Sequence, residues 1–271
     1  MDPTATTENA SDHPHPSPLG HATDRQRTLL KVARSEGRVS VTELADRFSV
    51  SAETMRRDLS ALEARGLVRR SYGLAYPVET AAYESDLVLR EVAHAGEKER
   101  IAAEAVRHVG DAETVFIDEG YTPQLIARLL PDSRLHIVTP SVPIASALAG
   151  RMDYTVYLLG GRLRGTTLGT VDHWATEMLS RFVIDLAYIG ANAISRDYGL
   201  TTPDPAVAEV KATAVRVSRR RIFTGVSQKF AVSSFCRFAE VTDFDVVISD
   251  RRLSSSEALR ISALGPAVMR V

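Results

Sequence analysis

A second cysteine is absent from the sequence, since Cys236 is the only one among 271 residues. This absence excludes an intramolecular disulfide and a cysteine-rich zinc site. No apolar run approaches the ~20 residues of a membrane-spanning helix, and the N-terminal residues lack the cationic and apolar regions of a signal peptide. These absences predict a cytoplasmic protein without a membrane partner.

An excess of one charge is also absent, because the net charge is only −1. Any affinity for nucleic acid must therefore come from local charge. The phosphate-binding sequences of nucleotide-binding proteins are missing too, since neither GxxxxGK[ST] nor GxGxxG follows an apolar strand run. His13 and His15 are held apart by a proline and make a poor preorganised metal site. The sequence predicts no cofactor and no metal.

The composition that is present divides the chain into four segments. Residues 1–22 are rich in Thr, Ser, Pro, His and Ala and bury too little apolar surface to offset their ordering entropy, which predicts a disordered tail. Residues 23–76 show helical periodicity and predict a small domain. Residues 77–96 predict a linker, and residues 97–271 predict a larger α/β domain.

The small domain shows the helical period three times. The first helix is expected to start near Thr23 and the second near Ser40, each with the spacing of a capping box. A turn at residues 49–51 leads to a third helix that ends at Gly66. The stretch LVRRSYGLAYPV then predicts a hairpin of two short strands around Gly73.

The third helix places polar and charged residues opposite its apolar side. At 100° per residue, Met55, Leu59 and Leu62 fall on one side of the helix. The opposite side has glutamate and arginine near the start of the helix and small residues further along. Such a helix suits insertion of its N-terminal half into a DNA major groove, where arginine reads guanine and glutamate reads cytosine. The hairpin arginines would meet the flanking backbone. The candidate DNA-binding residues are Ser51, Glu53, Thr54, Arg56, Arg57, Ser60, Arg69 and Arg70.

Local charge agrees with this prediction. Residues 23–76 carry 11 Lys and Arg against 7 Asp and Glu, a net charge of +4, so the rest of the chain carries −5. Cationic charge is concentrated in the small domain, as DNA binding requires. The alternative is a solvated helix whose arginines pair with Glu53 and Asp58.

The same residues carry a resemblance. The stretch SVTELADRFSVSAETMRRDLSALEARGLVRRSYGLA resembles the N-terminal winged helix-turn-helix of the DeoR family of bacterial transcriptional regulators. The matching positions are Ser51, Thr54, Met55, Arg56, Arg57, Asp58, Leu59, Leu62, Glu63 and Gly66. The GntR family shares part of the pattern but usually lacks the aspartate after the arginines. The DeoR family often has a glycine pair in its wing, where this chain has Gly73 and Leu74.

The larger domain alternates apolar strand runs with helical segments, which predicts a mostly parallel sheet. The strand runs are TVFID, LHIVT, YTVYLLG, LAYIGA, RIFTGV, DVVIS and AVMRV, and the helical segments are 97–109, 123–130, 143–148, 172–181 and 205–216. In such sheets, ligands bind beyond the carboxyl ends of the strands. Polar stretches follow four of these runs, and two of them start helices whose free amides could hold an anion. Each stretch alone also fits a structural role, but together they predict a site for an anionic small molecule.

This portion resembles the sensor domain of the DeoR family. The matches are Lys98, Ile101, Asp118–Thr122, Thr139–Ser141, Gly160, Gly161, Gly169, Asp185, Gly190, GLTT from Gly199, Glu209, Lys211, Ser227, Lys229 and Phe230. The resemblance implies a fold related to ribose-5-phosphate isomerases and CoA-transferases, and a phosphorylated sugar as effector. The candidate effector-binding residues are Asp118, Gly120, Tyr121, Thr122, Thr139, Ser141, Gly160, Gly161, Asn192, Lys211 and Lys229.

Two departures from the family pattern bear on function. Tyr121 stands where the family has a small hydroxyl residue, and Asn192 and Ala193 stand where it has Asp-Gly. An asparagine cannot act as a general base, which argues against isomerase activity.

The predicted fold class is an α+β winged helix-turn-helix domain followed by an α/β, mostly parallel-sheet sensor domain. The predicted function is a transcriptional regulator, not an enzyme: a repressor of a carbohydrate-metabolism operon, released by a phosphorylated sugar. Its expected partners are double-stranded operator DNA, the metabolite and further copies of the chain, as a homodimer or homotetramer. Two alternatives remain: a sugar-phosphate isomerase or transferase carrying a DNA module, and an effector-independent DNA-binding protein that oligomerises through its larger domain.

Overall fold

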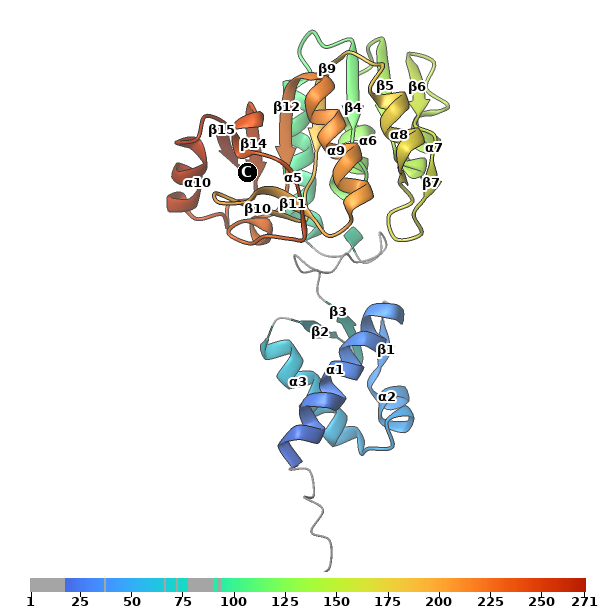
Figure 1. The fold of residues 1–271 in the computed structure, drawn as a ribbon, viewed down its shortest axis with the longest axis vertical. Helices are drawn as coiled ribbons and strands as arrows, with labels where there is room; N and C mark the ends of the chain where they lie inside the picture. Colours follow the sequence, from blue (N-terminus) through green and yellow to red (C-terminus); the bar gives the residue numbers. More distant parts are fainter. Residues whose placement is uncertain (1–17, 37, 66, 72, 78–89, 92–93) are drawn as a thin grey trace, which may run out of the picture. The chain divides into compact units, whose positions relative to one another are not determined.

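The structure, a computed structural model, describes residues 18–36, 38–65, 67–71, 73–77, 90–91 and 94–271. The chain forms two compact units, Met1–Val78 and Glu79–Val271 (Figure 1). None of the helices in the described residues is long and apolar enough to cross a membrane.

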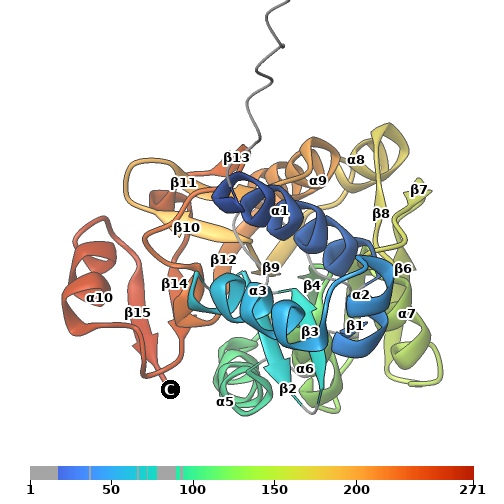
Figure 2. The same cartoon turned by 90° about the horizontal axis from the view of Figure 1, so that it is seen from below.

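The first unit contains three helices and a small antiparallel sheet. Its elements are α1 (Pro18–Glu36), β1 (Val39–Ser40), α2 (Val41–Arg47), α3 (Ala52–Ala64), β2 (Val68–Ser71) and β3 (Leu74–Pro77). The strand order is β1-β3-β2, and β2 with β3 forms the hairpin that we call the wing. Helix α1 packs against α3, and α3 packs against α2 (Figure 2).

The apolar periodicity of the helices builds the core of this unit. Met55, Leu59 and Leu62 of α3 are buried together with Leu29 of α1 and Leu44 of α2. The apolar side of α3 therefore faces α1 and α2, as its spacing predicts, and the opposite side faces solvent. The predicted winged helix-turn-helix is confirmed.

Two predictions for helix starts differ from the structure. Helix α1 begins at Pro18, so residues 18–22 of the predicted tail are helical; proline fits a first helical position because its missing N–H would have no helical partner there. The capping box at Ser40 does not form, because the Ser40 hydroxyl bonds to Thr42 at 2.8 Å. Gly66, residues 1–17 and most of the predicted linker lie outside the described residues.

The second unit is built on a sheet of seven strands, all parallel. The sheet order is β15-β14-β12-β9-β4-β5-β6. The strands are β4 (Thr114–Ile117), β5 (Leu135–Thr139), β6 (Tyr154–Leu158), β9 (Ile184–Ile189), β12 (Ser218–Thr224), β14 (Val246–Ser249) and β15 (Ala267–Arg270). These are the seven predicted runs, so the mostly parallel sheet is confirmed.

Helices cover both faces of this sheet (Figure 1). Residues of α5 (Ala95–Ala105), α6 (Tyr121–Leu129) and α7 (Val142–Leu148) form one apolar cluster with the sheet. Residues of α8 (His173–Leu179), α9 (Pro205–Val217) and α10 (Ser255–Ser262) form the other. Strand β4 supplies Val115 and Ile117 to the first cluster and Phe116 to the second, since side chains alternate along a strand.

The smaller elements were not all predicted. A hairpin of β7 (Arg162–Leu163) and β8 (Thr170–Val171) follows β6, and β10 (Ala193–Ser195), β11 (Gly199–Thr202) and β13 (Cys236–Ala239) form a separate antiparallel sheet. Helix α10 was missed, although the Ser254 hydroxyl caps it by accepting from the Glu257 amide at 3.1 Å. These strands have only two to four residues, too few to show a clear period.

The order of the strands favours a ligand crevice at one point of the sheet. After β4 the chain builds β5 and β6 on one side, then returns to β9 on the other side and continues to β12, β14 and β15. The loops that leave the neighbouring strands β4 and β9 therefore diverge. A crevice beyond the carboxyl ends of two such strands is the usual ligand position in an open parallel sheet.

Candidate functional site

The exposed side of α3 carries most of the predicted DNA-binding residues. Ser51 caps the helix by accepting from the Thr54 amide at 3.1 Å. The side chains of Arg56 and Arg57 are 58% and 80% exposed, and each forms an ion pair with the exposed Glu53, at 3.7 and 3.4 Å. Surface pairs of this kind contribute little to stability, so the arginines are available to a ligand. Ser60 is exposed on the same helix.

Asp58 does not pair with these arginines. It is buried and accepts hydrogen bonds from Arg25 Nε at 2.5 Å and from Gln26 Nε2 at 3.0 Å, both on α1. The aspartate of the Arg-Arg-Asp sequence therefore ties α3 to α1. It fixes the direction in which the two arginines of α3 project.

The two wing arginines lie in different surroundings. Arg69 is exposed. Arg70 donates to Glu63 from its amide at 2.9 Å and from its guanidinium at 2.7 Å, and to the Arg56 carbonyl at 3.3 Å. These hydrogen bonds from Arg70 lower the pKa of Glu63. Arg70 thus fastens the wing to α3, and Arg69 is the wing arginine most open to a phosphate.

A cleft opens in the second unit at the divergence of β4 and β9. It contains about 460 Å³ of space, including its open mouth. Its lining comes from residues far apart in the sequence, and we call the space between them the cleft. The lining residues are Arg90, Lys98, Glu119, Gly120, Tyr121, Thr122, Pro123, Gly190, Ala191, Asn192, Lys211, Thr224 and Lys229.

The lining of the cleft is mainly cationic. Among the described residues, it holds one arginine and three lysines against a single carboxylate, Glu119. Lys98 Nζ lies 5.6 Å from the centre of the Tyr121 ring, and Lys229 Nζ donates to the Ala191 carbonyl at 2.5 Å. Helix α6 starts at the same place, and within the part of the chain that the structure describes, no N-cap side chain bonds to its first amides. Charge and helix start together favour an anionic ligand.

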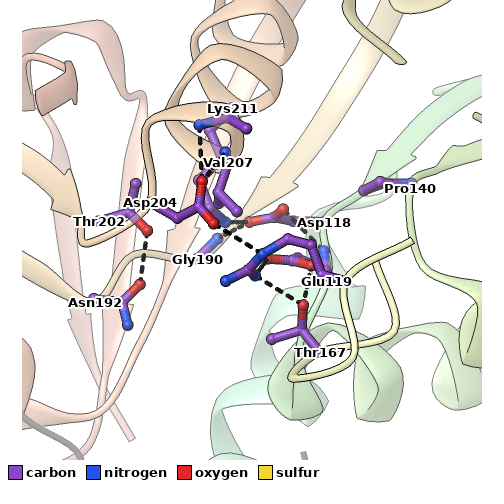
Figure 3. Close-up of polar contacts among 12 residues, drawn as sticks. Asp118, Glu119, Pro140, Thr167, Gly190, Asn192, Thr202, Asp204, Val207 and Lys211 are labelled. Atoms are coloured by element: carbon purple, nitrogen blue, oxygen red, sulfur yellow. Dashed lines mark hydrogen bonds and ion pairs between the residues drawn. The ribbon is translucent and has the colours of Figure 1, made fainter. Parts of the chain in front are cut away.

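The floor of the cleft is an ion pair between Asp118 and Lys211 (Figure 3). Asp118 is 1% exposed and Lys211 is 4% exposed. Asp118 also accepts from the Glu119 amide at 2.8 Å and from the Gly190 amide at 2.9 Å. Asp118 thus joins the ends of β4 and β9 to α9, and its charge is compensated within the protein.

A second buried network holds Glu119. The Arg164 guanidinium donates to Glu119 at 3.2 Å, to Asp204 at 3.1 Å and to Thr167 at 3.0 Å. The Thr167 hydroxyl donates to Glu119 at 2.5 Å. Gly169 permits this arrangement, since an added Cβ there would lie 1.8 Å from a Glu119 carboxylate oxygen. Arg164 therefore compensates Glu119 from behind the cleft.

Two polar atoms at the cleft lack hydrogen-bond partners among the described residues. They are Asn192 Nδ2 and Thr224 Oγ1, in side chains that are 9% and 2% exposed. The other end of the Asn192 amide accepts from the Thr202 hydroxyl at 3.0 Å (Figure 3). Buried polar atoms normally have partners, so these two mark places where a ligand can bond.

The structure brings together most of the predicted effector-binding residues. Those that line the cleft are Gly120, Tyr121, Thr122, Asn192, Lys211 and Lys229. Asp118 lies directly beneath them. Sequence reasoning missed Arg90, Lys98, Glu119 and Thr224 as lining residues, although Lys98 and Glu119 stand in stretches that it singled out.

Four predicted residues do not line the cleft. Ser141 is buried and caps α7, accepting from the Ile144 amide at 3.4 Å, and its own amide donates to Thr139 Oγ1 at 3.1 Å. Gly160 and Gly161 are exposed. Gly161 has φ +128°, and a Cβ there would lie 2.3 Å from the Val171 carbonyl oxygen. Its conformation and close packing explain the glycine without a ligand.

The two units define a class of protein: a winged helix-turn-helix DNA-binding module joined to an α/β module with a ligand cleft. Residues 25–80 match the model for the DeoR-like helix-turn-helix domain, and residues 93–251 match the model for the DeoR C terminal sensor domain. The chain belongs to the DeoR family. The predicted resemblance is confirmed.

Named relatives agree with this assignment. The HTH-type transcriptional regulator GlpR of Haloferax volcanii is 34% identical over 91% of this chain and 96% of its own length. The glycerol-3-phosphate regulon repressor of Escherichia coli K12 is 30% identical over 84% of this chain and 90% of its own length. Among solved structures, ribose 5-phosphate isomerase A of Methanocaldococcus jannaschii aligns over 51% of this chain and 56% of its own, with 15% identity and a TM-score of 0.37.

Both relatives are named as transcription regulators, and this chain aligns with 96% and 90% of their lengths. The chain is therefore a DNA-binding transcription regulator with a small-molecule sensor domain, and not an enzyme. This outcome confirms the predicted class and decides against the isomerase or transferase alternative.

Proposed function

We propose that the protein is a cytoplasmic repressor of a carbohydrate-metabolism operon, released from its operator by a phosphorylated sugar or a related metabolite. The observation that carries the proposal is the cationic cleft with two unpartnered buried polar atoms. The names of the relatives support the role as a repressor and the phosphorylated effector, since they include a glycerol-3-phosphate regulon repressor and the transcriptional repressor AccR of Agrobacterium fabrum.

On the DNA side, the N-terminal half of α3 enters the major groove. Arg56 and Arg57 read base edges or phosphates, and Glu53 helps to select the base. Ser51 and Thr54 contact phosphates beside the free amides of the helix start, and Arg69 contacts the flanking backbone. Two such modules are needed for a two-fold symmetric operator, so we propose a homodimer or a homotetramer.

On the ligand side, the cleft offers separate surroundings for the two ends of a sugar phosphate. The phosphate lies near the start of α6 and is neutralised by Lys98 and Lys229, because amides at a helix start and cations both favour an anion. A hydroxyl of the ligand bonds to Asn192 Nδ2 and Thr224 Oγ1, which removes the cost of leaving them unpaired. Tyr121 narrows the cleft from the side of α6.

The test joins two measurements on the full chain. Genome-wide mapping of bound DNA identifies the operator and its neighbouring genes, which suggest candidate metabolites. Calorimetry then measures binding of glycerol 3-phosphate, ribose 5-phosphate, fructose 6-phosphate and inorganic phosphate to the wild type and to Thr224→Val. We expect one sugar phosphate to bind at least tenfold tighter than inorganic phosphate, and Thr224→Val to lose most of that preference.

Two results would contradict the proposal. If no sugar phosphate binds tighter than inorganic phosphate, the cleft does not recognise a sugar. If a bound sugar phosphate leaves operator affinity unchanged at saturation, the cleft is not an inducer site for that ligand, because a ligand shifts an equilibrium only by its differential affinity for the two states.

A further inference from the structure

Arg90 stands at a particular place in the chain. It is the first described residue after the segment 78–89, which connects the two units covalently, and it lines the cleft. Arg90 lines the cleft, and its backbone directly follows the connecting segment, so a single residue joins the two. Nothing in the sequence patterns pointed to Arg90, since it lies in the stretch predicted as linker.

The backbone of Arg90 is fastened to the cleft by a second lining residue. Lys98 Nζ donates to the Arg90 carbonyl at 2.7 Å, and Lys98 is only 7% exposed. Lys98 also lies over the Tyr121 ring. A ligand that contacts Lys98 therefore also acts on the group that holds the Arg90 backbone.

The guanidinium of Arg90 lies against the start of α6. A Cβ placed on Gly120 would be 3.8 Å from Arg90 Nη1, and Gly120 has φ +116°, so the backbone turns there without a side chain in the way. The start of a helix carries partial positive charge. Arg90, Lys98 and the start of α6 therefore meet at one place in the lining of the cleft, and this combination suits an anion.

Resting on the proposed function, we infer that Arg90 binds the anionic group of the effector and thereby transmits occupancy of the cleft to the segment that leads to the DNA-binding unit. Arginine suits this role because its planar guanidinium can hold a phosphate through two hydrogen bonds. With the anion bound, Arg90 and Lys98 are held together and the end of the connecting segment is fixed. Without the anion, this bridge between the two side chains is absent.

The experiment compares Arg90→Gln with Arg100→Gln in the full chain. Both variants remove one positive charge, but Arg100 is exposed on α5, donates to the Gly96 carbonyl at 3.1 Å and does not line the cleft. Arg90→Lys keeps the positive charge but removes the planar guanidinium that can hold a phosphate through two hydrogen bonds. Asn192→Ala weakens ligand binding at a residue of the cleft that belongs to a different chain segment from Arg90.

Three quantities are measured with glycerol 3-phosphate, ribose 5-phosphate and fructose 6-phosphate as probes. They are the dissociation constant of the probe, the operator affinity with and without saturating probe, and hydrogen exchange of the amides in residues 79–94. Thermal unfolding checks that each variant is folded.

In the wild type and in Arg100→Gln, we expect a saturating probe to change operator affinity by about 5–150-fold, the usual range of allosteric coupling, and to slow exchange in residues 79–94. Arg90→Gln should bind the probe about tenfold or more weakly, as for a lost charge-assisted contact, and should respond less than about twofold even at saturation. Arg90→Lys should recover part of the binding. Asn192→Ala should bind weakly but respond fully once saturated.

The outcomes separate the two claims. A wild type that binds none of the probes overturns the proposed function together with this inference. A wild type that binds and responds, beside an Arg90→Gln variant that responds equally at saturation, overturns the inference alone. Loss of response in Arg100→Gln as well would show that the effect is one of overall charge and would also overturn it.

Discussion

Replacing Lys211 with methionine removes the cation that compensates Asp118, while the unbranched side chain keeps most of the packing. Asp118 is 1% exposed and Lys211 is 4% exposed. Breaking a buried ion pair at one end costs about 3–5 kcal/mol, because the other charge stays buried. The amides of Glu119 and Gly190 still donate to Asp118, so we expect a loss near the lower limit, about 3 kcal/mol.

The control is the double variant Asp118→Asn/Lys211→Met, which has no charge at this place. Its free energy of unfolding should lie within about 1 kcal/mol of the wild type, since uncharged replacements of a buried pair are often neutral. Thermal unfolding can be followed by the fluorescence of Trp174, the single tryptophan, which lies in the second unit. For a domain of this size, the Lys211→Met variant should unfold about 6–12 °C lower.

Two results would refute this reasoning. One is a Lys211→Met variant that loses less than about 1 kcal/mol, which would mean that Asp118 is not a buried charge in need of a partner. The other is a double variant no more stable than Lys211→Met, which would show that the two charges are not coupled.

Three further predictions concern the DNA contact, the cleft and the sheet. Arg57→Ala should weaken operator binding by about 1–3 kcal/mol and relax specificity at one base pair, as measured by mobility shifts on mutated operators. Asn192→Asp places a carboxylate in the cleft and should weaken sugar-phosphate binding at least tenfold by calorimetry. Burial alone would raise the pKa of Asp185, but hydrogen bonds from Thr114 outweigh it, so the pKa lies below its ordinary value. The stability that Asp185→Asn removes should therefore be present at pH 7 and lost as pH falls below about 4, in urea unfolding at both pH values.

The sequence was sufficient to predict the sheet and the DNA-binding helix, because both rest on local periodicity. Seven apolar runs became seven parallel strands, since a strand buried on both faces needs a continuous apolar run. Met55, Leu59 and Leu62 are buried as their helical spacing predicts. Helix α10 was missed because it covers the sheet near its edge and buries only Ile261 among its residues, which leaves little periodic signal.

The cleft was only partly predictable, because periodicity does not give the order of strands in a sheet. Thr139 ends β5 and Ser141 follows it, much as Ile117 ends β4 and Asp118 follows it, so the two stretches look alike in sequence. Only the divergence of the chain between β4 and β9 explains why the cleft lies beside Asp118 and not beside Ser141. Thr224 was missed because it is the last residue of β12, whereas the predicted residues of this region, such as Lys229, come from the polar stretch that follows the strand.

The distribution of charge in the second unit explains how a strand edge with two adjacent acids can favour an anion. Asp118 is paired with Lys211 and Glu119 with Arg164, both within the protein. With these two carboxylates compensated within the protein, the remaining charged side chains that line the cleft among the described residues are the cations Arg90, Lys98 and Lys229. Removing either internal partner would therefore do more than destabilise the fold. It would leave one carboxylate at the cleft uncompensated and so weaken the preference of the cleft for an anion.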